Sequence, residues 1–101
     1  MGESAKTMAT EISVNLAIVQ ADEPLCALAD VTIRVPELQV TIRRCPVFRR
    51  TGCPPWTNLP RLAILKGRKR HFVPLIELPL DVEKRVFSAV LAEYGRVAVA
   101  R

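Results

Sequence analysis

Residues 25–43 read LCALADVTIRVPELQVTIR, a stretch that predicts two β-strands joined by a tight connection. Apolar residues take every second position in most of both halves, and a period of two is typical of strands that bury one face. Pro36 separates the halves, because its fixed φ and missing backbone donor favour a turn over a continued strand. The sequence therefore predicts an antiparallel pair of strands, Leu25–Val35 and Leu38–Arg43.

Further strands are expected on both sides of this pair. Glu11–Val19 alternates strictly between apolar and polar or small residues, which predicts a first strand with one wet face. The runs 61–65 and 71–76 predict two short strands joined by a basic turn at residues 66–70. Pro74 places the last of these strands at a sheet edge, because proline donates no ladder hydrogen bond.

Two connections are predicted from their turn-forming residues. Residues 21–24 predict a turn, and residues 45–60, with four prolines and one glycine, predict a long loop without regular structure. The loop carries Phe48 and Trp56. Two roles for Trp56 remain open, since it could stack on an unpaired base or anchor the loop on the core.

One amphipathic helix is expected to begin at residues 78–81. Its apolar stripe has a spacing of four and consists of Val82, Val86, Val90 and Tyr94. Asp81 either caps the helix or lies in its first turn, and Gly95 predicts its end. The predicted fold class is α+β, an antiparallel β-meander of about five strands with one C-terminal amphipathic helix packed on the sheet. This single domain covers residues 11–101 and follows a flexible tail of residues 1–10.

The basic residues are unevenly distributed along the chain. Its 101 residues include 15 lysines and arginines and 10 acidic residues, which gives a net charge of +5. No acidic residue occurs between Glu37 and Glu77, whereas nine basic residues do: Arg43, Arg44, Arg49, Arg50, Arg61, Lys66, Arg68, Lys69 and Arg70. A cluster of one sign attracts polyanions, so we expect these side chains to share one exposed surface that grips phosphates. The alternative is that they are solvated loop charges.

Sequence motifs of enzymes do not occur in the chain. There is no glycine-rich phosphate loop, metalloprotease motif or nucleophile elbow. His71 has no acidic residue close to it in the sequence, so it is expected to be a nucleic-acid contact or a surface residue rather than a general base. Asp81 and Glu83 are expected to complement the helix dipole. We therefore predict no enzymatic activity, no cofactor and no small-molecule substrate.

The three cysteines are an odd number in a chain without a visible signal sequence, which suits a reducing cytoplasm. Cys26 is expected in a strand, and Cys45 and Cys53 in the long loop. With His71 they could supply four zinc ligands, but these come from unrelated segments, so we predict no metal site. The longest aliphatic runs, such as residues 62–65, are far shorter than the roughly 20 residues of a membrane span, so no membrane contact is expected.

Three stretches together point to a known family. Besides residues 25–43, residues 72–79 read FVPLIELP and residues 90–96 read VLAEYGR. These resemble, in order, the paired strands, the proline-ended strand before the helix and the Val-Leu-x-Glu-Tyr helix end of the SpoVG (septation regulator) family, over residues 11–96 in all. The resemblance implies a small bacterial dimer that binds DNA, with RNA as a second candidate target, and acts as a global regulator. It also implies contacts from a hairpin and from the helix end: Lys66, Arg68, Lys69, Arg70 and Arg96.

We therefore expect a small nucleic-acid-binding regulatory protein. The expected contacts are Arg43, Arg44, Arg49, Arg50, Lys66, Arg68, Lys69, Arg70 and Arg96. Two alternatives remain open: a protein-interaction module whose basic face docks an acidic partner, and an obligate assembly partner without a ligand of its own. A homodimer is expected, because a small core and open sheet edges both favour association.

Overall fold

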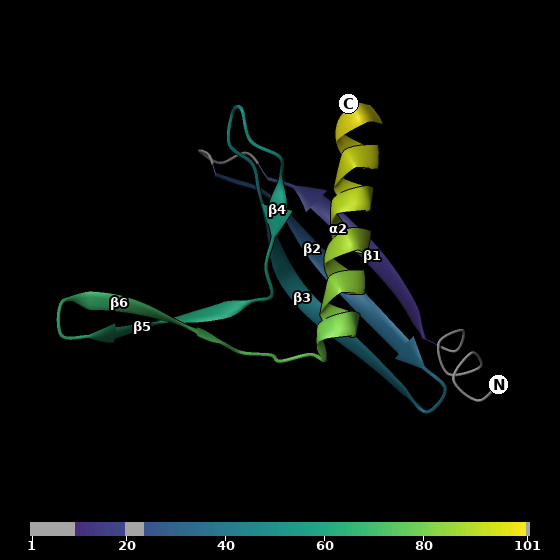
Figure 1. Ribbon diagram of the computed structural model, residues 1–101, viewed down its shortest axis with the longest axis horizontal. Helices are drawn as coiled ribbons and strands as arrows, with labels where there is room; N and C mark the ends of the chain where they lie inside the picture. Colours follow the sequence, from purple (N-terminus) through teal and green to yellow (C-terminus); the bar gives the residue numbers. More distant parts are fainter. Residues whose placement is uncertain (1–9, 20–23, 101) are drawn as a thin grey trace.

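The computed structural model describes residues 10–19 and 24–100 (Figure 1). The expected flexible tail, apart from Thr10, and the expected turn at residues 21–24, apart from Pro24, lie outside the described residues. The remaining elements form a sheet with a helix on one face and a separate hairpin that projects from this body (Figure 1).

The sheet has four antiparallel strands in the order β1-β2-β3-β4. Strands β1 (Glu11–Ile18), β2 (Leu25–Val35) and β3 (Leu38–Phe48) form the expected meander, and β4 (Trp56–Thr57) pairs only with the end of β3. The alternation in the sequence determines which face of the sheet is buried, and the four alternate residues of β2 are all buried: Ala27, Ala29, Val31 and Ile33.

Helix α2 (Leu80–Ala100) lies across one face of this sheet and contacts all four strands. Val86, Val90 and Tyr94 are buried in the same core cluster as Ala27 and Ala29 of β2. Asp81 and Glu83 lie in the first turn of the helix, where they complement its dipole as expected. The α+β fold class, with a C-terminal helix packed on an antiparallel sheet, is therefore confirmed. No helix among residues 10–19 and 24–100 is both long and apolar enough to cross a membrane.

The helix does not end at Gly95, as the sequence had predicted, but continues to Ala100. The four-residue stripe continues through Tyr94 to Ala98, which packs against the core. Glycine lowers helix propensity by only about 1 kcal/mol relative to alanine, so tertiary packing can carry the helix past it.

The predicted long loop at residues 45–60 is wrong at residues 45–48 and 56–57, because β3 extends to Phe48 and β4 follows at Trp56, whereas residues 49–55 do form a connection without helix or strand. Pro46 cannot donate a hydrogen bond, but its carbonyl accepts one from the Thr57 hydroxyl at 2.8 Å. Cys45 is consequently a buried strand residue rather than part of a loop.

The last two strands, β5 (Arg61–Lys66) and β6 (Lys69–Pro74), form a separate two-stranded sheet rather than joining the meander. We call this hairpin, residues 61–74, the arm. It projects along the longest axis of the molecule (Figure 1), and the radius of gyration of 15.4 Å exceeds the value of about 13 Å for a compact chain of this length. Pro74 does lie on an edge strand, since neither strand of the arm has a second neighbour.

Candidate nucleic-acid interface

The tip of the arm presents four cationic side chains. Lys66 pairs with Lys69 across the hairpin, and the turn between them consists of Gly67 and Arg68. Gly67 has a φ of 65°, which fits the first central position of a type II′ turn and is strained for other residues. All four cations, Lys66, Arg68, Lys69 and Arg70, are exposed, and no ion pair involves them within the described part of the chain.

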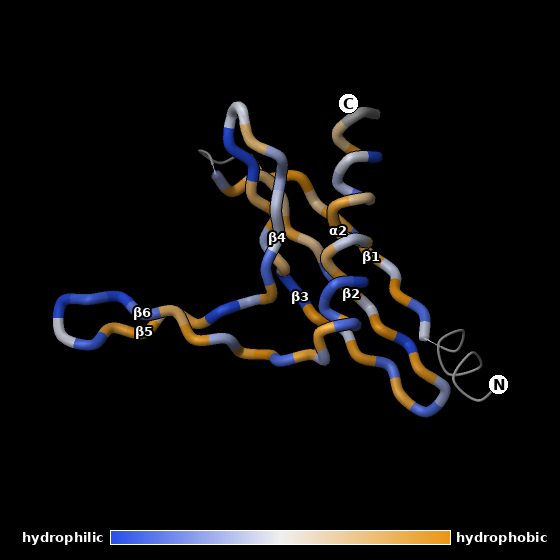
Figure 2. The backbone as a smooth tube through the Cα atoms, viewed as in Figure 1, coloured by the Kyte–Doolittle hydropathy of each residue, from blue (hydrophilic) through white to orange (hydrophobic). Residues whose placement is uncertain are grey.

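Residues paired across the hairpin share a face, so the register divides the arm into two faces. The aromatic face consists of Arg61, Ala63, Leu65, Arg70, Phe72 and Pro74. The lysine face consists of Leu62, Ile64, Lys66, Lys69, His71 and Val73. Along the arm, the hydropathy changes from apolar in the middle of the strands to hydrophilic at the tip (Figure 2). Arg70 therefore points away from the two lysines.

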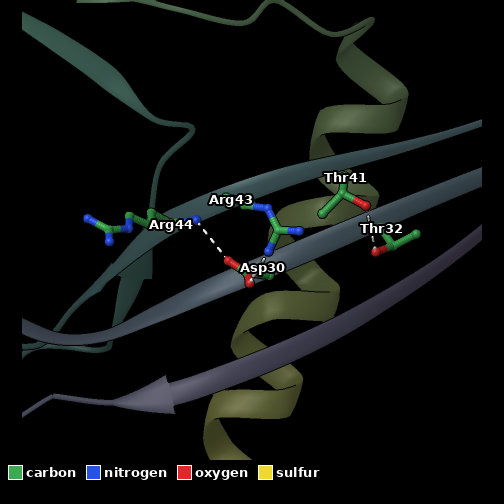
Figure 3. A network of polar contacts seen from close by, with 5 residues as sticks. All are labelled: Asp30, Thr32, Thr41, Arg43 and Arg44. Atoms are coloured by element: carbon green, nitrogen blue, oxygen red, sulfur yellow. Dashed lines mark hydrogen bonds and ion pairs between the residues drawn. The ribbon is translucent and has the colours of Figure 1, made fainter.

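Arg43 and Arg44 lie on β3, at a β-bulge opposite Asp30 (Figure 3). One oxygen of Asp30 accepts a hydrogen bond from the backbone N–H of Arg44 at 3.1 Å, and the other accepts one from the Arg43 guanidinium at 3.2 Å. Arg44 has a φ of 60°, a left-handed conformation that costs about 1–2 kcal/mol for a residue with a side chain. Asp30 thus stabilises the bulge and neutralises Arg43, while the Arg44 side chain points away from the carboxylate.

Arg49 and Arg50 begin the connection between β3 and β4, at the top of Figure 1. The backbone N–H of Arg49 donates to the carbonyl of Pro24 at 2.7 Å, which ties this connection to the start of β2. Trp56 stacks on Phe48, with ring centroids 5.5 Å apart and planes inclined by 26°. Trp56 is therefore anchored by an aromatic neighbour, although its side chain is still partly exposed.

Arg96 lies within α2 rather than after it, which corrects the position inferred from the resemblance. Its Nε donates to Glu93 Oε1 at 3.0 Å, and a second nitrogen binds the other oxygen. This hydrogen bond lowers the pKa of Glu93 and raises that of Arg96. The charge of Arg96 is thus already paired with a carboxylate one turn away.

The structure separates the nine basic residues that were expected to share one surface. The arm carries Arg61, Lys66, Arg68, Lys69 and Arg70, whereas the other four lie on the body: Arg43, Arg44, Arg49 and Arg50. The tip of the arm and the connection after β3 are at different extremities of the molecule (Figure 2). Sequence spacing could not reveal this division, because it depends on the arm leaving the sheet.

The cysteines and the histidine do not come together. Cys26 is half-buried, Cys45 is buried and Cys53 is exposed, and all three are free thiols. Burial, with a smaller contribution from the Asp30 carboxylate, raises the pKa of the Cys45 thiol to about 11. Among residues 10–19 and 24–100, no group of three or more histidine, cysteine or acidic side chains could hold a metal ion.

Two pockets lie at the base of the arm, and neither was predicted from the sequence. One, of about 380 Å³, has a mixed lining that includes Arg61 and Pro74 of the arm, Glu83 and Phe87 of α2, and Glu77 between them. The other, of about 310 Å³, lies between Phe72 of the arm and Phe48 of the body. Their residues come from segments whose proximity only the fold creates.

Comparison with known proteins does not place the chain in a family. No protein-family model matches the chain, and neither a curated protein nor a solved structure matches it.

Proposed function

We propose that this chain is a non-enzymatic, regulatory nucleic-acid-binding protein that contacts phosphates with the tip of its arm. The observation that carries the proposal is the arrangement of Lys66, Arg68 and Lys69, three exposed cations on a projecting hairpin turn without an ion pair among the described residues. Unpaired cations release the counterions of a polyanion most effectively.

The shape of the arm supports the same proposal. A two-stranded ribbon is narrow enough to enter the major groove of duplex DNA, and the arginine at the turn can donate two hydrogen bonds to one guanine. Arg44 is a second contact with nucleic acid in this proposal, because its strained backbone directs an exposed guanidinium away from Asp30. Arg43 and Arg96 contribute less, since each is paired with a carboxylate.

Binding of labelled duplex and single-stranded oligonucleotides over about 50–200 mM salt tests the proposal. Neutralising the turn in a K66Q/R68Q/K69Q variant should weaken binding to duplex by at least about tenfold at the low-salt end. The slope of log affinity against log salt should become shallower by about 2–3, because Lys66 and Lys69 contact phosphates and Arg68 contacts either a phosphate or a guanine.

A matched control has the same net charge but an intact tip. The variant R34Q/K84Q/R85Q removes three exposed cations from β2 and α2. It should retain most of the affinity and the steeper slope. Equal losses in both variants would mean that binding reflects net charge alone, and no binding by the parent protein at low salt would exclude the proposal.

A further inference from the structure

Phe72 of the arm exposes its ring beside a pocket of the body. Its side chain is 59% exposed, and it lines the smaller pocket together with Phe48, Asn58 and Arg61. The phosphate contacts of the tip do not account for this ring, because phosphates offer it no apolar contact. The pocket volume of about 310 Å³ lies at the small end of the range for ligand sites, which suits a single ring system.

The wall of the pocket on the side of the body combines an aromatic ring with an amide. Phe48 is half-buried, and its stacking on Trp56 holds its ring in place. The backbone N–H of Asn58 donates to the Pro46 carbonyl at 3.4 Å, which ties Asn58 to the end of β3. Aromatic rings stack on the faces of a nucleobase, and a carboxamide can donate to and accept from its edge. The lining therefore has both kinds of group that an unpaired base requires.

The register of the arm places Phe72 between two arginines. Along the aromatic face, the cross-strand pair that contains Phe72 lies between the pair that contains Arg61 and the pair that contains Arg70. Successive pairs on one face are about 7 Å apart, so one guanidinium lies towards the body and the other towards the tip. Neither arginine forms an ion pair within residues 10–19 and 24–100, and no acidic residue lines this pocket. A base on Phe72 would therefore have a cation on each side, where its two flanking phosphates lie.

We propose that this pocket binds one unpaired nucleobase of a single-stranded nucleic acid. The base would stack on Phe72 and Phe48 with its edge towards Asn58, and Arg61 and Arg70 would contact the adjacent phosphates. The inference rests on the proposed function, because the tip holds the same strand, and it adds a preference for unpaired bases. A base within a duplex is stacked and paired, so it enters such a pocket only at the cost of leaving the helix.

Two strands with the same number of phosphates test the pocket. One is an oligothymidine of about 12 nucleotides, and the other is an abasic strand of the same length. At about 50 mM salt the parent protein should bind the oligothymidine about tenfold more tightly, as expected for one base stacked on aromatic rings. F72A should remove most of this difference and leave the affinity for the abasic strand within about twofold. An unchanged affinity for the abasic strand also shows that the arm of the variant is intact.

Two further variants are controls for F72A. F72W keeps an aromatic ring at this position and should retain the preference for the oligothymidine. L62A removes an apolar side chain that is 50% exposed, but it lies on the lysine face and does not line the pocket, so it should behave as the parent does.

Four outcomes would overturn the inference. The first is that the parent binds both strands equally, and the second is that L62A is as defective as F72A. The third is that F72A weakens binding of both strands to the same extent. The fourth is that F72A loses self-association in sedimentation but keeps its affinity for the oligothymidine, which would assign the pocket to a second copy of the chain.

The K66Q/R68Q/K69Q variant separates the pocket from the tip. If this variant weakens binding of both strands and F72A weakens neither, only the pocket is overturned. If F72A removes the preference for the oligothymidine while the tip variant keeps the salt slope of the parent, only the phosphate contacts of the tip are overturned. A parent protein that binds neither strand at low salt would overturn both.

Discussion

The body and the arm are built from the same kind of strand but differ in what covers it. In β2, alternate residues from Ala27 to Ile33 are buried under α2. In β5 and β6 half of the residues are apolar, yet nearly every side chain is exposed. An alternating pattern therefore specifies which face a strand can bury, and it leaves open whether the covering surface belongs to the same chain.

The cations differ in the same way between the two regions. On the outer face of the body, Arg34 lies 3.6 Å from Glu11 and Arg43 lies 3.2 Å from Asp30. At the tip of the arm, Lys66, Arg68 and Lys69 have no such partner among the described residues. Two arginines of this face are thus paired within the body, whereas the arm has both apolar and charged groups available for other molecules.

The largest expected effect is the loss of stability when a large apolar side chain is truncated, which should be much greater in the body than in the arm. Ile42 of β3 is buried, and I42A should lower the free energy of unfolding by about 3 kcal/mol, since it leaves a cavity in the core. L65A in the arm should lower it by less than about 0.5 kcal/mol at concentrations where the chain is monomeric. Urea denaturation measures both values, and equal losses would remove the distinction between body and arm.

The pH dependence of stability is a second test of side-chain burial in the body, through the buried thiol of Cys45. The unfolded chain loses the Cys45 proton at lower pH than the folded chain, whose thiol has a pKa of about 11. Stability from this group is present below about pH 9 and should fall by about 2 kcal/mol as the pH rises to about 11. Urea denaturation at pH 8 and pH 11 should show a smaller fall for C45A than for the parent, whereas C53A should behave as the parent does.

The smallest expected effect is that of replacing a glycine by alanine, which should have opposite signs in the two regions. At Gly95 in α2 an added Cβ meets no atom within 4 Å, and G95A should raise stability by about 0.5–1 kcal/mol through helix propensity. At Gly67 in the arm the φ of 65° disfavours a side chain, so G67A should lower stability by about 1 kcal/mol. Thermal unfolding of the two variants checks both signs, and a gain at Gly67 would contradict the observed turn.

The sequence predicts the body better than the arm. Strands β1 and β2 match their expected bounds within one residue, because a period of two is a local property of the chain. The bounds of β5 and β6 were also close to those predicted. Their separation from the main sheet was not predicted, because it depends on which strand each edge meets and not on any local pattern.

The other errors have a common physical origin in packing. Turn-forming residues suggested a loop from Cys45 and a helix end at Gly95, but tertiary contacts outweighed both preferences. The candidate site shows the same limit. The basic tip is visible in the sequence, whereas the pairing of Arg43 with Asp30 and the carboxylates beside the arm depend on the fold.

The attachment of the arm determines how far its tip can travel. The arm joins the body at Pro60 and Leu75, where the Leu75 N–H donates to the Pro60 carbonyl at 3.3 Å. Six residues per strand make a lever of about 20 Å, so a tilt of about 10° at this junction moves the tip by about 3 Å. Small adjustments at two residues therefore change the spacing between the cationic turn and the body, which would let one molecule fit anionic surfaces of different curvature.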